Sequence, residues 1–503
     1  MIEHRPRLAL SVAEDGCVPS LATLALLAGL SERGMKVQHF RTRSCLTGLE
    51  TYARATGFHP RHLDPWLMGR ETCQAAFHHG GRHADLAVIE GHLPPRSHLY
   101  PQKDLPTLSS SCQAAFSSPC LGDLNCPEGQ ELCDRHEPEF ASGGLASLCE
   151  TLDLPKVAVV SCRGLEGFHL PPLPEGIDAV LLDGLEHPEE IDALRHVFEV
   201  FWRLPVLAAI EAFPEFRRLV ASDHFLVGRD DELLHELARS FLQTADLDLL
   251  HQLIKRPFHH ARPFSFIPAR QGCFRVALAQ DDAFDTYFPD TLEALEHLGA
   301  DLVEFSPLRD DQVPPDCDLI LLGCGHPDQF ASELAANLSM IYSLRASVCR
   351  GTRLYAEGGG AAWLAEALEV DGQVVPGVGL FPGVVAQRLR TSAGSQRVCR
   401  VLRHDTWLGS CGQVVRGYAT PHWRFQIHSS DSSGPNGFPR HAAVQTLTCS
   451  GDMVGRHRAV ASLVHLHLTA LPEFLAAFAS QSVPLNGSAT ISPSIRPAPG
   501  HSS

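Results

Sequence analysis

The stretch at 318–368 places the tightest limits on how this chain folds. A short apolar run, 319–322, enters a glycine loop, and a second apolar run, 352–357, stops at three consecutive glycines. The apolar residues that follow lie at helical spacing and predict a helix: Ala361, Ala362, Leu364, Ala365 and Leu368. A strand that ends in a tight turn before a helix has the geometry of a nucleophile elbow. At the tip of this turn, however, stands Gly358, which has no side chain.

The rest of the chain alternates short apolar runs with helical segments. Strands at 7–13 and 36–41 flank a helix at 20–33, an opening typical of a nucleotide-binding domain. Further predicted strands are 84–89, 156–162, 179–182, 205–210, 274–279 and 301–305. This alternation predicts an α/β fold, in which parallel sheets are covered by helices on both faces.

Changes in composition divide the chain. The predicted segments are a first domain at 1–255, an irregular insertion at 94–142, a proline-containing linker at 256–272, a second domain at 273–482 and a disordered tail at 483–503. The formal charge of −17 argues against a nucleic-acid or anionic-membrane partner. With no membrane-length apolar run and no signal peptide at the N-terminus, we expect a cytoplasmic protein.

Four of the 16 cysteines fall in the insertion: Cys112, Cys120, Cys126 and Cys133. The gaps between them are seven, five and six residues, so no CxxC pair occurs. Four thiolates this close in sequence can hold zinc or an iron–sulfur cluster. Unliganded loop thiols are the alternative, and the missing CxxC pair favours them.

Five stretches, in this order along the chain, carry a family resemblance: HLDPWLMG at 62–69, the run from FRVALAQ to SPLRD at 274–310, GCGHPDQFASELAANLSM at 323–340, YAEGGG at 355–360 and SLVHLHL at 462–468. With them the chain resembles the cobyrinic acid a,c-diamide synthase family from Arg7 to Phe478. The resemblance implies a P-loop-type synthetase domain followed by a class I glutamine amidotransferase-like, flavodoxin-like domain. It also implies a carbon–nitrogen ligase of cobalamin-type biosynthesis. Such an enzyme uses ATP, Mg²⁺ and glutamine to amidate tetrapyrrole carboxylates.

The resemblance assigns roles in the second domain. The family elbow reads Tyr-Ala-Glu-Cys-Gly-Gly, so Gly358 stands where the nucleophilic cysteine is expected. The matching residues are the base His465, the elbow residue Glu357, and the oxyanion and elbow glycines Gly323, Gly325, Gly359 and Gly360. Two other thiols, Cys324 and Cys349, lie nearby in sequence but not on the elbow. We expect both to be inert, because an error of about 1 Å in such geometry costs roughly a hundredfold in rate.

The nucleotide site departs from the family in the same way. The P-loop lysine is Pro19, which removes a charge and an amide donor, and the aspartate expected to help hold Mg²⁺ is Cys45. The matching residues that remain are Gly16, Ser20, Glu90 and Asp64.

These losses predict a catalytically impaired protein or a pseudoenzyme that binds a tetrapyrrole-like molecule. One alternative is an amide ligase that uses free ammonia, although it leaves Pro19 unexplained. The other is a non-catalytic scaffold for an active paralogue. A homo-oligomer also stays open.

Overall fold

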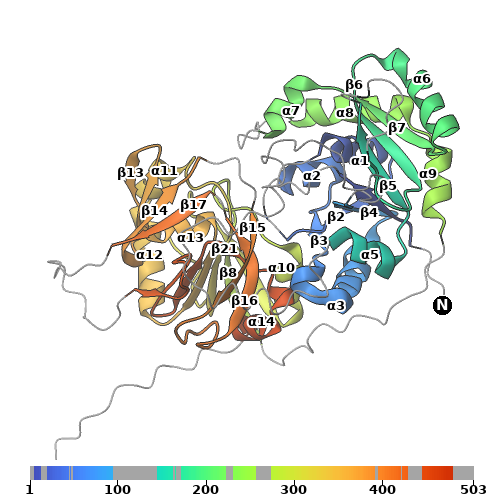
Figure 1. Ribbon diagram of the computed structural model, residues 1–503. Helices are drawn as coiled ribbons and strands as arrows, with labels where there is room; N and C mark the ends of the chain where they lie inside the picture. The colour runs from blue at the N-terminus through green and yellow to red at the C-terminus, as the bar shows by residue number, and fades with distance from the viewer. Residues whose placement is uncertain are drawn as a thin grey trace, which may run out of the picture.

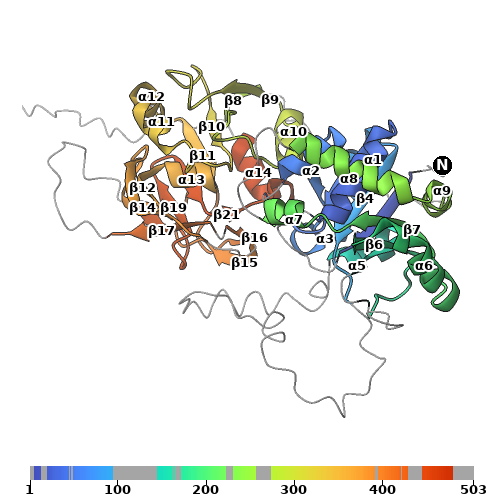
Figure 2. The same ribbon diagram turned by 90° about the horizontal axis from the view of Figure 1, so that it is seen from above.

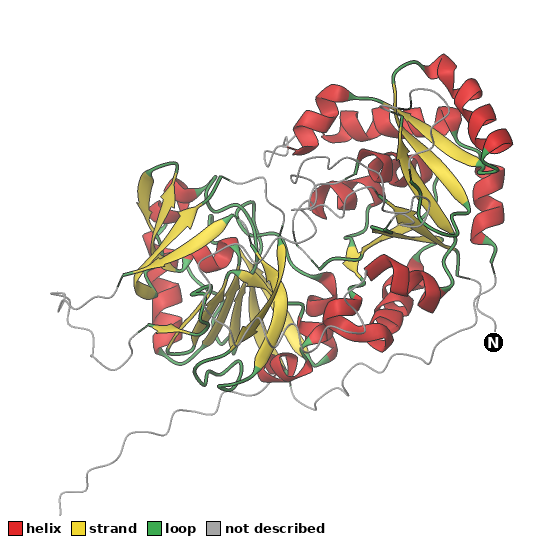
Figure 3. Ribbon diagram, viewed as in Figure 1, coloured by secondary structure: helices red, strands yellow, loops and turns green. Residues whose placement is uncertain are grey.

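Two large sheets, one in each half of the chain and built mainly of parallel strands, form the core of the computed structural model (Figure 1). The structure describes residues 5–12, 20–44, 46, 49–94, 144–162, 165, 172–221, 230–256, 273–390, 395–420, 422–428 and 444–479. Figure 3 shows strands enclosed by helices in both halves, which confirms the predicted α/β class. Among these residues, no helix is long and apolar enough to cross a membrane.

The N-terminal sheet is parallel throughout, in the order β3-β2-β4-β1-β5-β6-β7. Its strands are β1 (Arg7–Ser11), β2 (Val37–Arg41), β3 (Arg61–His62), β4 (Leu86–Gly91), β5 (Lys156–Ser161), β6 (Ala179–Leu185) and β7 (Val206–Glu211). Its helices are α1 (Leu21–Glu32), α2 (Leu49–Thr56), α3 (Pro65–Gly80), α5 (Gly144–Leu152), α6 (Ile191–His196), α7 (Pro214–Ala221), α8 (Asp230–Thr244) and α9 (Leu247–Ile254).

Helix α1 is the central helix of this half. Residues 21–30 are all buried, as expected for a helix that is apolar on every side. Ser20 caps the helix by accepting a hydrogen bond from the Thr23 N–H. Figure 2 shows α8 lying along α1, and Phe241 of α8 packs where a side chain at Gly29 would stand. Helix α1 is therefore part of the hydrophobic core, and the Ser20 side chain caps its N-terminus.

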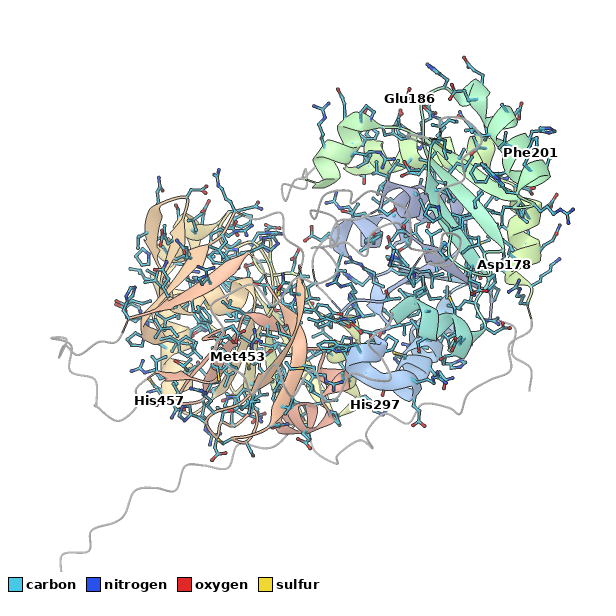
Figure 4. The ribbon with its side chains drawn as sticks, viewed as in Figure 1. Asp178, Glu186, Phe201, His297, Met453 and His457 are labelled. Carbon is cyan, nitrogen blue, oxygen red and sulfur yellow. The ribbon has the colours of Figure 1, made fainter. Side chains whose placement is uncertain are left out.

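The C-terminal sheet has the order β18-β19-β20-β11-β10-β8-β9 and is parallel from β20 to β9. Its strands are β8 (Phe274–Ala279), β9 (Ala300–Phe305), β10 (Leu319–Leu322), β11 (Arg353–Glu357), β18 (Gln445–Thr446), β19 (Met453–Arg456) and β20 (Ala459–Ser462). Figure 4 shows Met453 inside this half and His457, in the turn between β19 and β20, at its outer edge.

Two smaller sheets complete the C-terminal half. Their strands are β12 (Ala365–Val370), β13 (Gln373–Pro376), β14 (Phe381–Arg388), β15 (Gln396–Val401), β16 (Val414–Ala419), β17 (Trp423–Ile427) and β21 (Val464–His465). The helices are α10 (Pro289–His297), α11 (Ala331–Ala336), α12 (Leu338–Cys349), α13 (Gly359–Trp363) and α14 (Pro472–Ala479).

One predicted helix is wrong in length. The apolar spacing after Gly358 predicts a helix through Leu368, but α13 ends at Trp363 and β12 begins at Ala365. Strand β12 gains backbone hydrogen bonds from both β13 and β14. This pairing outweighs the local helical pattern, as tertiary contacts often do.

A buried ion-pair cluster joins the two halves. Arg61 of β3 pairs with Asp290 and Glu293 of α10, and His79 of α3 lies 2.7 Å from the same Glu293. The Arg61 and Asp290 side chains are only 10% and 5% exposed. Figure 1 shows α3 beside α10 and α14 at this junction. The N-terminal half is thus held against the C-terminal half by charges that have little access to water.

A second tie lies inside the C-terminal half. Glu357, at the end of β11, accepts hydrogen bonds from the Leu466 N–H at 2.5 Å and the Tyr355 hydroxyl at 3.0 Å. Burial raises the pKa of Glu357 to about 8, although both hydrogen bonds oppose the shift. The Glu357 carboxyl group thus ties the residue after β21 to the end of β11, which carries the glycine turn.

We expect Arg61→Ala to lower the free energy of unfolding by about 3 kcal/mol, because it leaves the buried Asp290 carboxylate without its charged partner. Denaturant unfolding measures the change. Arg309→Ala is the control, because Arg309 and Asp282 form a pair that is 63% and 72% exposed. That variant should cost less than about 1 kcal/mol. Equal losses in the two variants would contradict a buried junction.

The Glu357 carboxyl group predicts a pH dependence of stability. Between about pH 4.5 and 8 the folded state keeps a proton that the unfolded state has released, so stability falls as pH rises through this window. Glu357→Gln carries no such proton, and its unfolding free energy should change less with pH. Parallel slopes for the two proteins, measured by denaturant unfolding at several pH values, would disprove the shifted carboxyl.

Candidate functional site

The glycine turn after β11 keeps the backbone of an elbow. Gly358 has φ 54° and ψ −116°, a region that disfavours residues with a Cβ. Side chains on Gly359 or Gly360 would collide with the carbonyl oxygens of Gly325 and Gly323. The two glycine loops therefore pack backbone against backbone, and this closeness explains the run of glycines.

A sulfur atom occupies the space above this turn. The Cys324 Sγ lies 3.3 Å from the His465 Nε2, and Cys324 is only 8% exposed. A Cβ atom built on Gly358 would collide with this same Sγ, and it would stand 3.5 Å from the His465 Nε2. The Cys324 thiol, on the neighbouring loop, thus occupies the space that a side chain at position 358 would fill.

The structure places the Cys324 thiol against the elbow and its base, whereas its position in the sequence set it apart from the elbow. The difference arises because the loop at 323–325 packs directly onto the elbow. The signal was a cysteine between two glycines, in a loop that the resemblance already brought to the elbow. Cys349, the other thiol considered, ends α12, is exposed, and does not line the pocket described below.

Only two of the four predicted oxyanion glycines have a backbone N–H that is available to an oxyanion. The Gly323 N–H bonds the Tyr287 hydroxyl, and the Gly360 N–H bonds the Gly323 carbonyl. Within the described part of the chain, the N–H groups of Gly325 and Gly359 have no hydrogen-bond partner, and both residues line the same pocket as Cys324. They are the donors left for an oxyanion.

The predicted base His465 lies on β21 and is 5% exposed. Its strand neighbour in β16 is Tyr418. While Nε2 faces the Cys324 sulfur, Nδ1 accepts a 3.5 Å hydrogen bond from the backbone N–H of Leu46. The N-terminal half therefore touches the imidazole of the C-terminal site directly.

The pocket at this site has about 650 Å³ of empty space, counting its open mouth. Both halves line it: the N-terminal half supplies Leu46, Leu49 and Glu50, and the C-terminal half supplies Cys324, Gly325, Gly359 and His465 among others. Three more lining residues interact with one another: Arg388 pairs with Asp328 at 3.0 Å and lies over the Trp423 ring. The pocket is thus lined by a thiol, an imidazole and charged groups of both signs.

Two of the predicted nucleotide residues, Ser20 and Glu90, share Tyr52 as a partner: its hydroxyl accepts from the Ser20 N–H at 3.2 Å and donates to the Glu90 carboxylate. Glu90 is buried, and its carboxylate already accepts hydrogen bonds from Thr23 at 2.9 Å, Tyr52 at 2.9 Å and His39 at 3.0 Å. Burial alone would raise the pKa of Glu90, but the His39 hydrogen bond and the Arg41 charge lower it. The Ser20 hydroxyl caps α1, and Gly16 lies outside the described residues.

Asp64 faces the other half of the protein. Its Oδ1 accepts from the Trp66 N–H at 3.1 Å, and its Oδ2 accepts from Ser44 N–H at 3.1 Å and from the Tyr418 hydroxyl at 2.5 Å. Neither Glu90 nor Asp64 thus offers an open carboxylate edge. Residues 13–19, where the phosphates would bind, lie outside the described residues, so ATP–Mg²⁺ stays a prediction and we derive no step through it.

No group of three or more potential metal ligands occurs in the described ranges. Cys112, Cys120, Cys126 and Cys133 lie in the segment 95–143, outside those ranges. The proposed zinc or iron–sulfur site therefore stays a prediction.

Comparison with known proteins agrees with this architecture. Residues 275–471 match the model of the CobB/CobQ-like glutamine amidotransferase domain. A cobyrinate a,c-diamide synthase of Salmonella typhimurium is 28% identical over 92% of this chain and 95% of its own length. One from Synechocystis is 26% identical over 90% of this chain and 88% of its own length.

Among solved structures, a crystal structure of a glutamine amidotransferase superposes with a TM-score of 0.30 at 18% identity, covering 41% of this chain and 98% of its own. The relatives cover both halves of the chain. The chain is therefore similar to the cobyrinate a,c-diamide synthases over most of its length, and residues 275–471 match the CobB/CobQ-like glutamine amidotransferase domain.

Proposed function

We propose that the C-terminal half hydrolyses a carboxamide such as the side-chain amide of glutamine, with Cys324 as the nucleophile in place of an elbow cysteine. The observation that carries this proposal is the 3.3 Å contact between the Cys324 Sγ and the His465 Nε2, directly above Gly358. A thiol beside an imidazole is the arrangement that activates cysteine for attack on a carbonyl carbon.

In the first step the neutral imidazole carries its ring proton on Nδ1, which gives up the 3.5 Å hydrogen bond from the Leu46 N–H. His465 Nε2 then takes the thiol proton, and the Cys324 sulfur attacks the amide carbon. A C–S bond forms, and the N–H groups of Gly325 and Gly359 are placed to stabilise the oxyanion. The C–N bond then breaks, and the proton on His465 leaves with the nitrogen as ammonia. Water, deprotonated by His465, attacks the thioester, the C–S bond breaks, and the thiol returns with the carboxylic acid as product.

The N-terminal half has no part in this chemistry as a nucleotide site. The relatives are named for cobyrinate amidation, and their names suggest a tetrapyrrole acid as the partner of this chain. Pro19 in the sequence and the closed Glu90 cluster argue that ATP does not drive amidation here. We therefore propose impairment of the synthetase half alone.

The second candidate is a protein without catalytic activity in either half, which binds a tetrapyrrole-like ligand or an active paralogue. The loss of the cysteine from the elbow, where Gly358 now stands, favours it. The position of Cys324 argues against this second candidate, because the thiol lies within 3.3 Å of the predicted base.

We expect Cys324→Ala to lower the rate of ammonia release from glutamine by about a thousandfold or more, since no thioester can then form. A coupled ammonia assay at neutral pH measures it. Cys349→Ala removes an exposed thiol from the same half and should leave the rate unchanged. ATP–Mg²⁺ should not alter either rate. Turnover that survives in Cys324→Ala would reject the proposal, and so would absence of turnover in the unmodified protein.

A reciprocal exchange tests whether the two loops share one sulfur position. Gly358→Cys alone should be destabilised and no more active, because its Cβ collides with the Cys324 sulfur. The double variant Cys324→Gly with Gly358→Cys relieves the collision, and we expect ammonia release within about tenfold of the unmodified protein. Additive effects in this cycle, or a fully active single variant, would show that the two positions are independent.

A further inference from the structure

Two polar atoms in the wall of the Cys324 pocket have no hydrogen-bond partner among the described residues. They are the Asp328 Oδ1 and the Thr420 Oγ1, and both are shielded from water. Both residues line the pocket that holds the thiol and the imidazole. Buried polar atoms are nearly always hydrogen-bonded in folded proteins, because leaving the bond unmade costs free energy. Two such atoms in one pocket therefore indicate a ligand that bonds them.

The Asp328 carboxylate is only half satisfied by the protein. Its Oδ2 accepts from the Arg388 Nε at 3.0 Å, and the two side chains are 15% and 14% exposed. Its Oδ1 has no donor within the described part of the chain. Glu50 also lines the pocket, but it is exposed, so water can satisfy its oxygens. Of these two carboxylates, Asp328 is the one that depends on a ligand for its second oxygen.

Arg388 joins Asp328 to the chain beside Thr420. Besides the Asp328 carboxylate it bonds the carbonyl of His422, two residues after Thr420, at 3.3 Å. The N–H of Thr420 itself donates to the Leu463 carbonyl at 2.9 Å, which fixes its backbone. The two atoms without partners thus lie on segments that one guanidinium links.

The chemistry of these two atoms selects the ligand group. A carboxylate oxygen only accepts hydrogen bonds, whereas a hydroxyl both donates and accepts them. A primary ammonium has three N–H donors, so it can bond both oxygens at once, and its bond to Asp328 is charge-assisted. A ligand carboxylate can accept from Thr420 but is repelled by Asp328. The pair therefore fits a cationic ammonium group.

We propose that Asp328 and Thr420 are specificity-determining residues that bind an ammonium group of the amide hydrolysed at Cys324. The inference rests on the proposed function, and it narrows the substrate to amides that carry a free primary amine, as the α-amino group of glutamine does. A carboxamide without such a group leaves the Asp328 Oδ1 unpaired in the complex, and it binds less tightly for that reason.

Calorimetric titration of the full chain tests this proposal in the Cys324→Ala background, which forms no thioester, so that binding is measured without turnover. The probes are L-glutamine and glutaramic acid, which is glutamine with hydrogen in place of the α-amino group. A hydrogen bond to a charged group is worth about tenfold to a hundredfold in affinity, so glutamine should bind more tightly by that factor. Equal affinities for the two probes would overturn the inference, and so would absence of glutamine binding.

Thr420→Val, in the same background, separates ligand binding from support of the fold. Valine has nearly the shape of threonine, and the lost hydroxyl makes no hydrogen bond with the described residues. The thermal midpoint should therefore stay the same or rise, while the affinity for glutamine falls about threefold to tenfold. The affinity for glutaramic acid should not change. An equal loss for both probes would contradict recognition of the ammonium group.

Asp328→Asn removes the charge, and Asp282→Asn is its matched control. Asp282 is also paired with an arginine, Arg309, but it is 72% exposed and is not among the residues that line the pocket. Asp328→Asn should weaken glutamine binding about tenfold or more and leave glutaramic acid binding nearly unchanged, whereas Asp282→Asn should change neither. Unchanged glutamine affinity in Asp328→Asn would refute the assignment.

The binding measurement and the ammonia assay fail separately. If Cys324 is not a nucleophile, ammonia release is absent while the preference for glutamine over glutaramic acid persists. If Asp328 and Thr420 do not recognise an ammonium group, that preference is lost while the unmodified protein still releases ammonia.

Discussion

The space above Gly358 holds one sulfur atom, and the rest of the site depends on that limit. The Cys324 Sγ fills the space, contacts the imidazole of His465 and leaves no room for a Cβ on the elbow. A thiol on either loop reaches the same imidazole, but thiols on both loops collide. Gly358 therefore does not by itself show that the site has no thiol. Because Gly358 lacks a side chain, there is room for the Cys324 sulfur above the turn.

The junction between the two halves contains buried ion pairs and hydrogen bonds. Its polar groups are buried and matched: Arg61 with Asp290, and Tyr418 with Asp64. Removing one member of such a pair leaves the other without compensation in a medium of low dielectric constant. The halves are thus held in one arrangement, and the 3.5 Å contact between Leu46 and His465 inherits that arrangement.

The sequence predicts the strands well, because buried parallel strands are short apolar runs bounded by turn residues. It also places His465 and the glycine turn at one site, through the family resemblance. At Cys324 the resemblance brings the loop to the elbow but does not reveal that the sulfur lies 3.3 Å from the His465 Nε2, because that distance depends on how two loops more than thirty residues apart pack. The sequence fails at Asp64, whose partners Ser44 and Tyr418 belong to different halves, so that no local pattern reveals them. The strand β12 is missed because pairing with β13 and β14 outweighs a helical spacing.

The polar groups of the two halves differ in how their hydrogen bonds are satisfied. In the N-terminal half, Glu90 is the acceptor of a hydrogen-bond cluster with Thr23, His39 and Tyr52, and Asp64 bonds Tyr418 across the junction. Buried polar groups that bond one another stabilise a fold but leave no donor or acceptor for a ligand. In the C-terminal half the polar groups still point into an open pocket, with the N–H groups of Gly325 and Gly359 beside the thiol. The N-terminal half, whose buried polar groups bond one another, supports the site in the C-terminal half. It contacts that site through the Leu46 N–H and the imidazole of His465.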